Sequence, residues 1–190
     1  RTLNILLRFD DDAYEGYFLR GIAKYNLDDL LGAEADFTTA IEKNPVFTTA
    51  FTYRAITRSR LGNYDDALSD FAEAIELRPD LPNAYYRRGE LEMKQQRYKE
   101  AEADFDMAIR CDSNYLLSYF NRAIVRSQIG DYNRALEDYD KVAFYSPENV
   151  LVYYNRAGIQ AQLGNIESAV EDYSKAIELY PDFANAYLNR

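Results

Sequence analysis

Two charged side chains recur along this sequence at a constant spacing, and they suggest acid–base or anion-binding chemistry. Arginine returns every 34 residues, and an aspartate follows each of the first five arginines by 16 residues. The arginines are Arg20, Arg54, Arg88, Arg122, Arg156 and Arg190, and the aspartates are Asp36, Asp70, Asp104, Asp138 and Asp172. The other interpretation is a structural ladder, in which each guanidinium forks onto a carboxylate of a neighbouring helix. A catalytic site is singular, so a pair present at every step favours the ladder.

The direction of this pairing has two solutions, because an aspartate can meet the arginine of its own unit or that of the next unit. Only the second arrangement supplies Arg190 with a partner, Asp172. We therefore expect each aspartate to pair with the arginine of the following unit.

Other residues that commonly carry chemistry are scarce. There is no histidine, and Cys111 is the single cysteine, so a small apolar role suits it better than that of a nucleophile. The triplet Asp10, Asp11 and Asp12 lacks the ligand spacing of a calcium loop and is interpreted as a solvated linker. No phosphate-binding glycine loop is present. We expect no enzyme activity, no catalytic residue, no cofactor and no metal.

Composition narrows the kinds of partner. The net charge of −10 opposes binding to nucleic acid, which basic surfaces favour. No apolar run reaches the roughly 18 residues that a membrane span needs, so we expect no membrane insertion. The opening RTLNILLRFDDD does not resemble a signal peptide. Cytoplasmic and exported locations both stay open.

The elements that position these residues follow from the same 34-residue period. Five units begin at Tyr14, Thr48, Pro82, Leu116 and Val150. Place eight of each unit is glycine or alanine, place twenty is alanine, and places four and twenty-four are aromatic. Small residues allow two helices to approach closely, and the rings fill the space beside them. Glycine near the middle of three units indicates a turn, and proline closes most units, so each unit is predicted to be a helical hairpin.

This pattern resembles the tetratricopeptide repeat (TPR) family over about Tyr14 to Pro181. The resemblance implies an all-α, right-handed superhelical solenoid of helical hairpins. Departures are Asp28 and Gln96 in place of the turn glycine, Val142 at place twenty-seven and Ser113 in place of proline. The predicted divisions are a helix remnant over residues 1–13, five units over 14–47, 48–81, 82–115, 116–149 and 150–183, and a first-helix stub over 184–190.

Family resemblance also locates a binding surface, because the first helices of this family line a concave groove with places 2, 5, 6, 9, 12 and 13. These places are rich in rings, and place nine reads Ile22, Ile56, Glu90, Ile124 and Gly158. The predicted contact residues are Phe18, Ile22, Tyr25, Tyr53, Tyr86, Arg87, Phe120, Asn121, Ile124, Tyr154, Asn155 and Asn189. Since other places supply the core, we interpret the rings as surplus to packing and available for binding.

Place six is asparagine in the last two complete units and the stub. The row is similar to the asparagines of the O-linked sugar transferases, which hold a peptide backbone. It also fits a simple family preference, and both interpretations stay open. By contrast, no three-unit window carries the carboxylate clamp of the chaperone-binding members.

We therefore expect a scaffold that binds an extended peptide or partner segment in the groove. The alternative is a structural module that self-associates end to end or docks other domains of a longer polypeptide. The partner's identity stays open in both cases.

Overall fold

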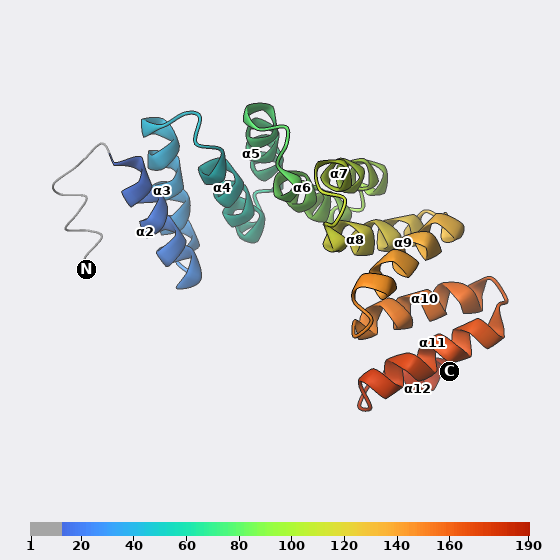
Figure 1. Ribbon diagram of the computed structural model, residues 1–190. Helices are drawn as coiled ribbons and strands as arrows, with labels where there is room; N and C mark the ends of the chain where they lie inside the picture. Colours follow the sequence, from blue (N-terminus) through green and yellow to red (C-terminus); the bar gives the residue numbers. More distant parts are fainter. Residues whose placement is uncertain (1–12) are drawn as a thin grey trace. The chain divides into compact units, whose positions relative to one another are not determined.

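The computed structural model describes residues 13–190, which form eleven α-helices and no strand (Figure 1). The helices are α2 (Tyr14–Asn26), α3 (Leu30–Lys43), α4 (Thr48–Leu61), α5 (Tyr64–Leu77), α6 (Pro82–Lys94), α7 (Tyr98–Cys111), α8 (Leu116–Gln128), α9 (Tyr132–Tyr145), α10 (Val150–Gln162), α11 (Ile166–Leu179) and α12 (Ala184–Asn189). The all-α fold of helical hairpins is thereby confirmed. The predicted helix remnant over 1–13 lies outside the described residues except for Ala13.

Each hairpin turn depends on one residue in the left-handed backbone region. That residue is Gly62, Gly130 or Gly164 in three hairpins, with φ between 83° and 86°, and Asp28 or Gln96 in the other two, with φ of 65° and 60°. In all five, the N–H of the following residue donates to a carbonyl five residues earlier, as in Asn63 N–H to Arg58 O at 2.9 Å. This closure satisfies a carbonyl at the helix end. Asp28 and Gln96 therefore adopt the conformation of the glycine that they replace.

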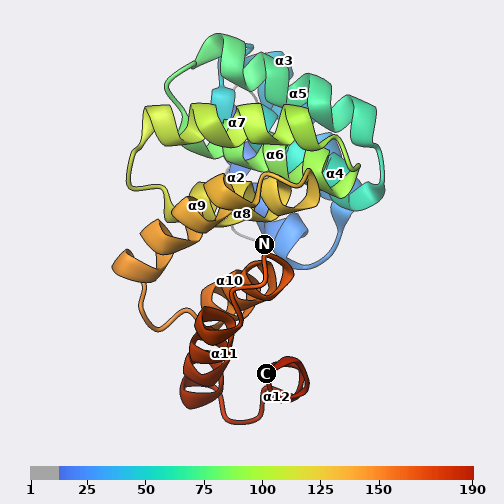
Figure 2. The same cartoon turned by 90° about the vertical axis from the view of Figure 1, so that its right-hand side faces the viewer.

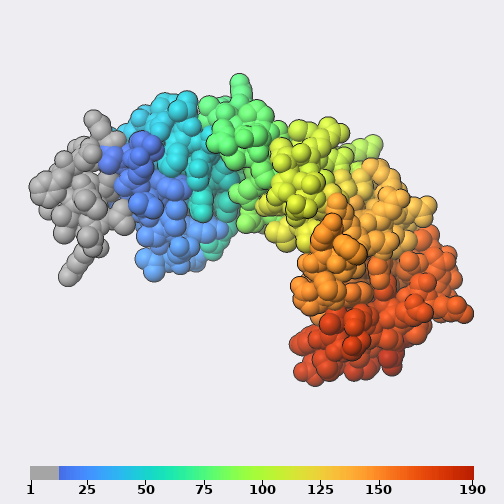
Figure 3. Space-filling view, in the orientation of Figure 1, coloured from blue at the N-terminus to red at the C-terminus, as the bar shows by residue number. Residues whose placement is uncertain are grey.

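The described chain divides into two compact units, which meet in sequence between Leu91 and Glu92 within α6. In the first unit, α2 packs on α3 and α4 on α5, and α3 also contacts α4. In the second unit, α8 packs on α9 and α10 on α11, with α7 against α8 and α12 against α11. Figure 1 shows α10 and α11 side by side, Figure 2 shows the short α12 that follows α11, and Figure 3 shows the red atoms of α12 at the molecular surface.

The core of each hairpin combines small residues with one large ring. Ala33, Ala67 and Ala135 at place twenty are fully buried, and so are the place-twenty-four rings Phe37 and Phe105. A Cβ added at Gly21 would lie 2.6 Å from a ring carbon of Phe37. Place eight must therefore be small, because the facing helix brings its ring against that backbone.

Candidate functional site

The arginine–aspartate pairs join the two helices of one hairpin, so the expected pairing with the next unit is wrong. Arg122 donates from Nε and Nη2 to both oxygens of Asp138, at 2.9 and 2.6 Å. Arg20, Arg54 and Arg156 make the same fork onto Asp36, Asp70 and Asp172, with distances between 2.6 and 2.9 Å. Asp172 is thus the partner of Arg156, whereas Arg190 lies over the ring of Tyr187 at 5.7 Å.

The remaining guanidinium nitrogen explains how the ladder also joins neighbouring hairpins. Nη1 of Arg122 donates to Asp106 of the preceding hairpin at 2.6 Å, and Nη1 of Arg156 donates to Asp140 at 2.7 Å. In the first unit, Nη1 of Arg54 reaches the hydroxyl of Thr38 at 3.2 Å. Nε and Nη2 of each arginine bind the buried carboxylate of the same hairpin, so only Nη1 is left to contact the preceding hairpin.

A second row of basic residues, which sequence reasoning missed, reinforces the ladder. Arg58 bridges Glu34 and Asp70, both at 2.8 Å, and Arg126 bridges Glu102 and Asp138, both at 2.7 Å. The signal was the recurrence of arginine 68 residues apart, at place eleven. Each of these side chains joins a carboxylate of the preceding hairpin to one of its own hairpin.

The electrostatic setting of the ladder is that of satisfied ion pairs. Burial opposes the charge of Arg122, but its hydrogen bonds to Asp138 and Asp106 and the attraction of both carboxylates outweigh this effect and raise the pKa of the guanidinium. Burial similarly opposes ionisation of Asp36, and its bonds to Arg20 and Lys24 reverse that effect and lower its pKa. Each ladder arginine also lies over the place-four ring of its own helix, as Arg122 does over Tyr119 at 5.2 Å. These charged groups therefore hold the helices together.

The aromatic residues predicted for the first unit are partly used in packing. Phe18 contacts the rings of Phe37, Phe47 and Tyr53, with centroids 4.9 to 5.7 Å apart. Arg60 covers the ring of Tyr25 at 4.8 Å. Phe18 therefore contributes to packing, because this place-five ring leans on Phe37, the place-twenty-four ring of its hairpin, and the binding role of these rings stays a prediction. Phe18, Ile22, Tyr25 and Tyr53 keep part of their surface exposed.

Two other predicted contacts of the first unit also have partners within the unit. Tyr86 is 5% exposed, and its hydroxyl donates to Glu90 at 2.8 Å. Arg87 is exposed, and its Nη1 donates to the other oxygen of Glu90 at 2.9 Å. The carboxylate of Glu90 thus ties both side chains to their own helix.

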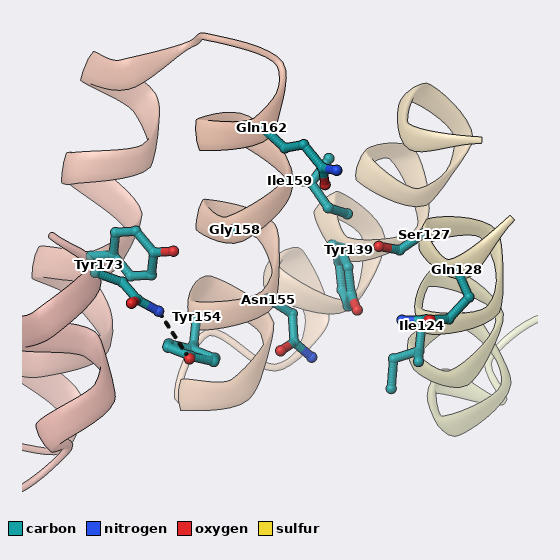
Figure 4. A pocket seen from close by; sticks show the side chains of 11 residues that line it. Ile124, Ser127, Gln128, Tyr139, Tyr154, Asn155, Gly158, Ile159, Gln162 and Tyr173 are labelled. Atoms are coloured by element: carbon teal, nitrogen blue, oxygen red, sulfur yellow. Dashed lines mark hydrogen bonds between the residues drawn. The ribbon is translucent and has the colours of Figure 1, made fainter. Parts of the chain in front are cut away.

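A pocket of about 420 Å³ lies in the second unit, on the side of the first helices (Figure 4). Helix α8 supplies Ile124, Ser127 and Gln128, and α10 supplies most of the opposite wall. Tyr139 of α9 and Tyr173 of α11 lie at its base, and Asn189 of α12 borders it. Of the predicted contact residues, the structure brings together Ile124, Tyr154, Asn155 and Asn189.

The asparagine row does not behave as one set. Asn121 is 9% exposed and does not line the pocket. Asn155 is half-buried, with the hydroxyl of Tyr139 beside it. Asn189 is exposed and donates from Nδ2 to the hydroxyl of Tyr154 at 3.1 Å.

The predicted contact rings of the second unit also pack on core rings. Phe120 leans on the ring of Tyr139 and Tyr154 leans on the ring of Tyr173, in both cases with centroids 5.8 Å apart.

The pocket lining is neutral and rich in hydrogen-bonding groups. The polar groups of the lining side chains are carboxamides, one serine hydroxyl and tyrosine hydroxyls. Burial raises the pKa of Tyr139 well above the usual range of a phenol, although the neighbouring Asn155 acts in the opposite direction. Burial and the neighbouring Tyr154 also raise the pKa of Tyr173. Both phenols are therefore protonated at neutral pH and can donate or accept a hydrogen bond.

Several lining residues were not among the predicted contacts. Ser127, Gln128 and Gln162 occupy places twelve and thirteen, which the family resemblance points inward, so their place was available as a signal. The repeat pattern assigns Tyr139 and Tyr173 to the core, and they serve both the core and the pocket floor. Ile159 at place ten carried no such signal.

The described part of the chain offers neither a metal centre nor a membrane span. Among residues 13–190, cysteine and carboxylate side chains form no group of three that could hold a metal ion. None of the helices in that range combines the length and apolar character that crossing a membrane requires.

The helical hairpins, their buried small residues and their left-handed turns define a helical repeat protein. Family models described as tetratricopeptide repeat match residues 52–115 and 150–183. The chain belongs to the tetratricopeptide repeat family. This family's fold generally serves as a non-enzymatic scaffold for contacts between proteins, so proteins are the partners that it indicates.

Solved structures agree on the fold. YrrB, described as a TPR protein with an unusual peptide-binding site, is 20% identical over 99% of this chain and 97% of its own, with a TM-score of 0.83. MamA is 21% identical over 87% and 96% of the two chains, with a TM-score of 0.81. PilF of Pseudomonas aeruginosa is 18% identical over 94% and 82%, with a TM-score of 0.82. A comparison with curated proteins finds no match.

Proposed function

We propose that this chain is an interaction scaffold that binds an extended segment of a partner protein, and that the pocket of the second unit holds part of that segment. The observation that carries the proposal is the pocket itself. Its volume of about 420 Å³ is open on the first-helix side, and four residues predicted as contacts line it. Such a concave site with a few converging polar groups is the usual form of a binding site.

Backbone recognition is the chemistry that suits its walls. An extended peptide exposes N–H and C=O groups that lose water on binding and need new partners. A carboxamide offers a donor and an acceptor together, and Gln128, Asn155, Gln162 and Asn189 place four of them around the pocket. These side chains can therefore pair with peptide groups whatever residues the segment carries.

The rings and the similarity to a solved structure support the same proposal. Tyr154 and Ile124 provide apolar surface beside the amides. The partly exposed rings of Phe18 and Tyr53 are proposed contacts of the first unit. YrrB, which is similar to nearly the whole chain, is a TPR protein with a peptide-binding site, and this similarity favours a peptide as the ligand here too.

The proposal is tested with peptides selected from a random display library against the purified chain and titrated by calorimetry. Replacing Asn155 and Asn189 together by Ala should weaken binding by about 1 to 3 kcal/mol with little change in the melting temperature. Asn133→Ala is the matched control, because Asn133 is an exposed asparagine of α9 outside the pocket lining. Asn121 is left unchanged, because its burial would confound affinity with stability.

The same titrations separate the proposed backbone contacts from a carboxylate clamp. Peptides with a free or an amidated C-terminus should bind equally well. Equal loss of affinity in Asn133→Ala and in the double variant would contradict the proposed site.

A second candidate function is end-to-end self-association, and the exposed apolar residues of α12 favour it. Leu188 is 83% exposed and Tyr187 is 49% exposed. Sedimentation of the chain at rising concentration tests this candidate. A mass that rises with concentration in the parent and stays constant in Leu188→Glu would support assembly through α12.

A further inference from the structure

The pocket of the second unit exists where the sequence departs from its own repeat. Place nine is isoleucine in three units, at Ile22, Ile56 and Ile124, whereas the fifth unit has Gly158. Ile124 and Gly158 both line the pocket, from α8 and α10 respectively (Figure 4). A branched side chain at Gly158 would project from α10 into this space.

Helix packing does not explain this glycine. A Cβ added at Gly158 would have the hydroxyl of Tyr173 as its nearest neighbour, at 3.8 Å, an ordinary van der Waals distance. The contrast is Gly21, where the added Cβ would meet Phe37 at 2.6 Å. Since glycine is also among the least favourable residues inside a helix, its presence in the middle of α10 favours a role in keeping the pocket open.

The chemistry of the walls selects what can enter. The lining residues carry no ionised side chain at neutral pH, because tyrosines are the only titratable groups among them. A charged group that entered would lose water without gaining a counter-charge, and a purely apolar group would displace water from amides and hydroxyls that it cannot pair with. A neutral side chain with a hydrogen-bonding end avoids both costs, and its stem can lie against Ile124 and Ile159.

We propose that the space beside Gly158 is a specificity pocket for one neutral, hydrogen-bonding side chain of the bound segment, a carboxamide or a phenol. This inference rests on the proposed peptide-binding function and adds which residue the segment must carry. Gly158 determines the depth of the pocket, and the hydroxyl of Tyr173 and the amides of Asn155 and Asn189 provide its polar partners.

The probes for the test are single blocked amino acids, namely the N-acetyl methylamides of glutamine, tyrosine, leucine, glutamate and lysine. Each is titrated into the isotopically labelled chain, and the NMR shift of the Gly158 amide is followed. The glutamine and tyrosine probes should shift this amide in a saturable manner. The leucine, glutamate and lysine probes should bind at least about tenfold more weakly.

Variants at Gly158 then test whether the absence of a side chain at this position keeps the pocket open. Gly158→Ile should reduce the affinity for the glutamine probe about tenfold or more, because the new side chain fills the space. Gly158→Ala should keep the affinity within about threefold, because its Cβ clears Tyr173. Ala161→Ile is the control, since Ala161 is an exposed residue of α10 outside the lining, and it should leave the affinity unchanged. Binding in the isoleucine variants is read from the shifts of Asn155 and Tyr173.

The outcomes separate this inference from the proposed function. Equal binding of charged and neutral probes, strongest binding of leucine, no shift at Gly158 with any probe, or unchanged affinity in Gly158→Ile would each overturn the specificity pocket. If selected peptides still bind and depend on Asn155 and Asn189, the proposed function stands without it. If selected peptides show no such dependence, the proposed function fails by its own test.

Discussion

Removing Arg122 tests the structural role of the ladder most directly. Arg122→Ala deletes three hydrogen bonds, two to Asp138 and one to Asp106. The variant should unfold more easily than the parent, because the side chain of Asp138 is only 5% exposed and loses its bidentate partner.

The size of the effect follows from what each carboxylate keeps. Asp106 has a third of its side chain exposed and recovers water, so its pair contributes about 1 kcal/mol at most. Breaking a buried pair completely costs about 3 to 5 kcal/mol. Asp138 retains Nη1 of Arg126 at 2.7 Å, which reduces that cost. We expect a loss of about 2 to 4 kcal/mol in the free energy of unfolding.

Urea denaturation followed by circular dichroism measures this loss. Arg134→Ala is the matched control, because the side chain of Arg134 is 52% exposed and contacts Asp131 at 3.1 Å and Glu102 at 3.4 Å. Its cost should be below about 1 kcal/mol, as for other surface ion pairs. Equal denaturation midpoints for the two variants would refute the reasoning that the ladder stabilises the hairpins.

Two further predictions concern pH and the turns. Burial alone would raise the pKa of Asp36, but Arg20 and Lys24 outweigh burial and lower this pKa in the folded chain. The ion pairs of Asp36 therefore stabilise the fold fully above the unfolded pKa of about 3.9, and this stabilisation is lost as the pH falls through the folded pKa. Asp36→Asn should therefore lower the free energy of unfolding at neutral pH by about 1 to 3 kcal/mol and melt like the parent in strong acid; a constant difference at all pH values would contradict the ion pair. Gln96→Gly should stabilise the chain by about 0.5 to 1 kcal/mol, because residue 96 has a φ of 60°. The reverse change at the equivalent turn, Gly130→Gln, should lower the melting temperature, and stabilisation by both changes would refute the assignment of these turns.

Comparison of sequence and structure shows which features a repeat pattern can predict. Small residues at place eight, alanine at place twenty and a ring at place twenty-four occur in every complete unit, and each describes one contact between the two helices of a hairpin. Such a contact involves residues close in sequence and has one geometry, so periodicity is sufficient to predict it. The turn positions of Asp28 and Gln96 were identified in the same way, because the period aligns them with Gly62.

The sequence predicted the ladder only in part. Its arginines and aspartates were recognisable from their period, but their direction of pairing was not, because spacing alone allows either neighbour. The structure decides it: both oxygens of Asp138 face Nε and Nη2 of Arg122 within one hairpin, and only Nη1 remains for the preceding hairpin.

Only the tertiary structure reveals the pocket, because the pocket depends on residues that depart from the repeat and on how deeply each side chain is buried. Asn121 and Asn155 occupy the same place of successive units, yet the first is buried and the second lines the pocket. Gly158 departs from the isoleucine that three other units carry at place nine, and the effect of this change appears only when side chains of α8, α11 and α12 line the same pocket. A sequence period states what all units share, whereas the space available to a ligand is set by the particular side chains that neighbouring helices bring together.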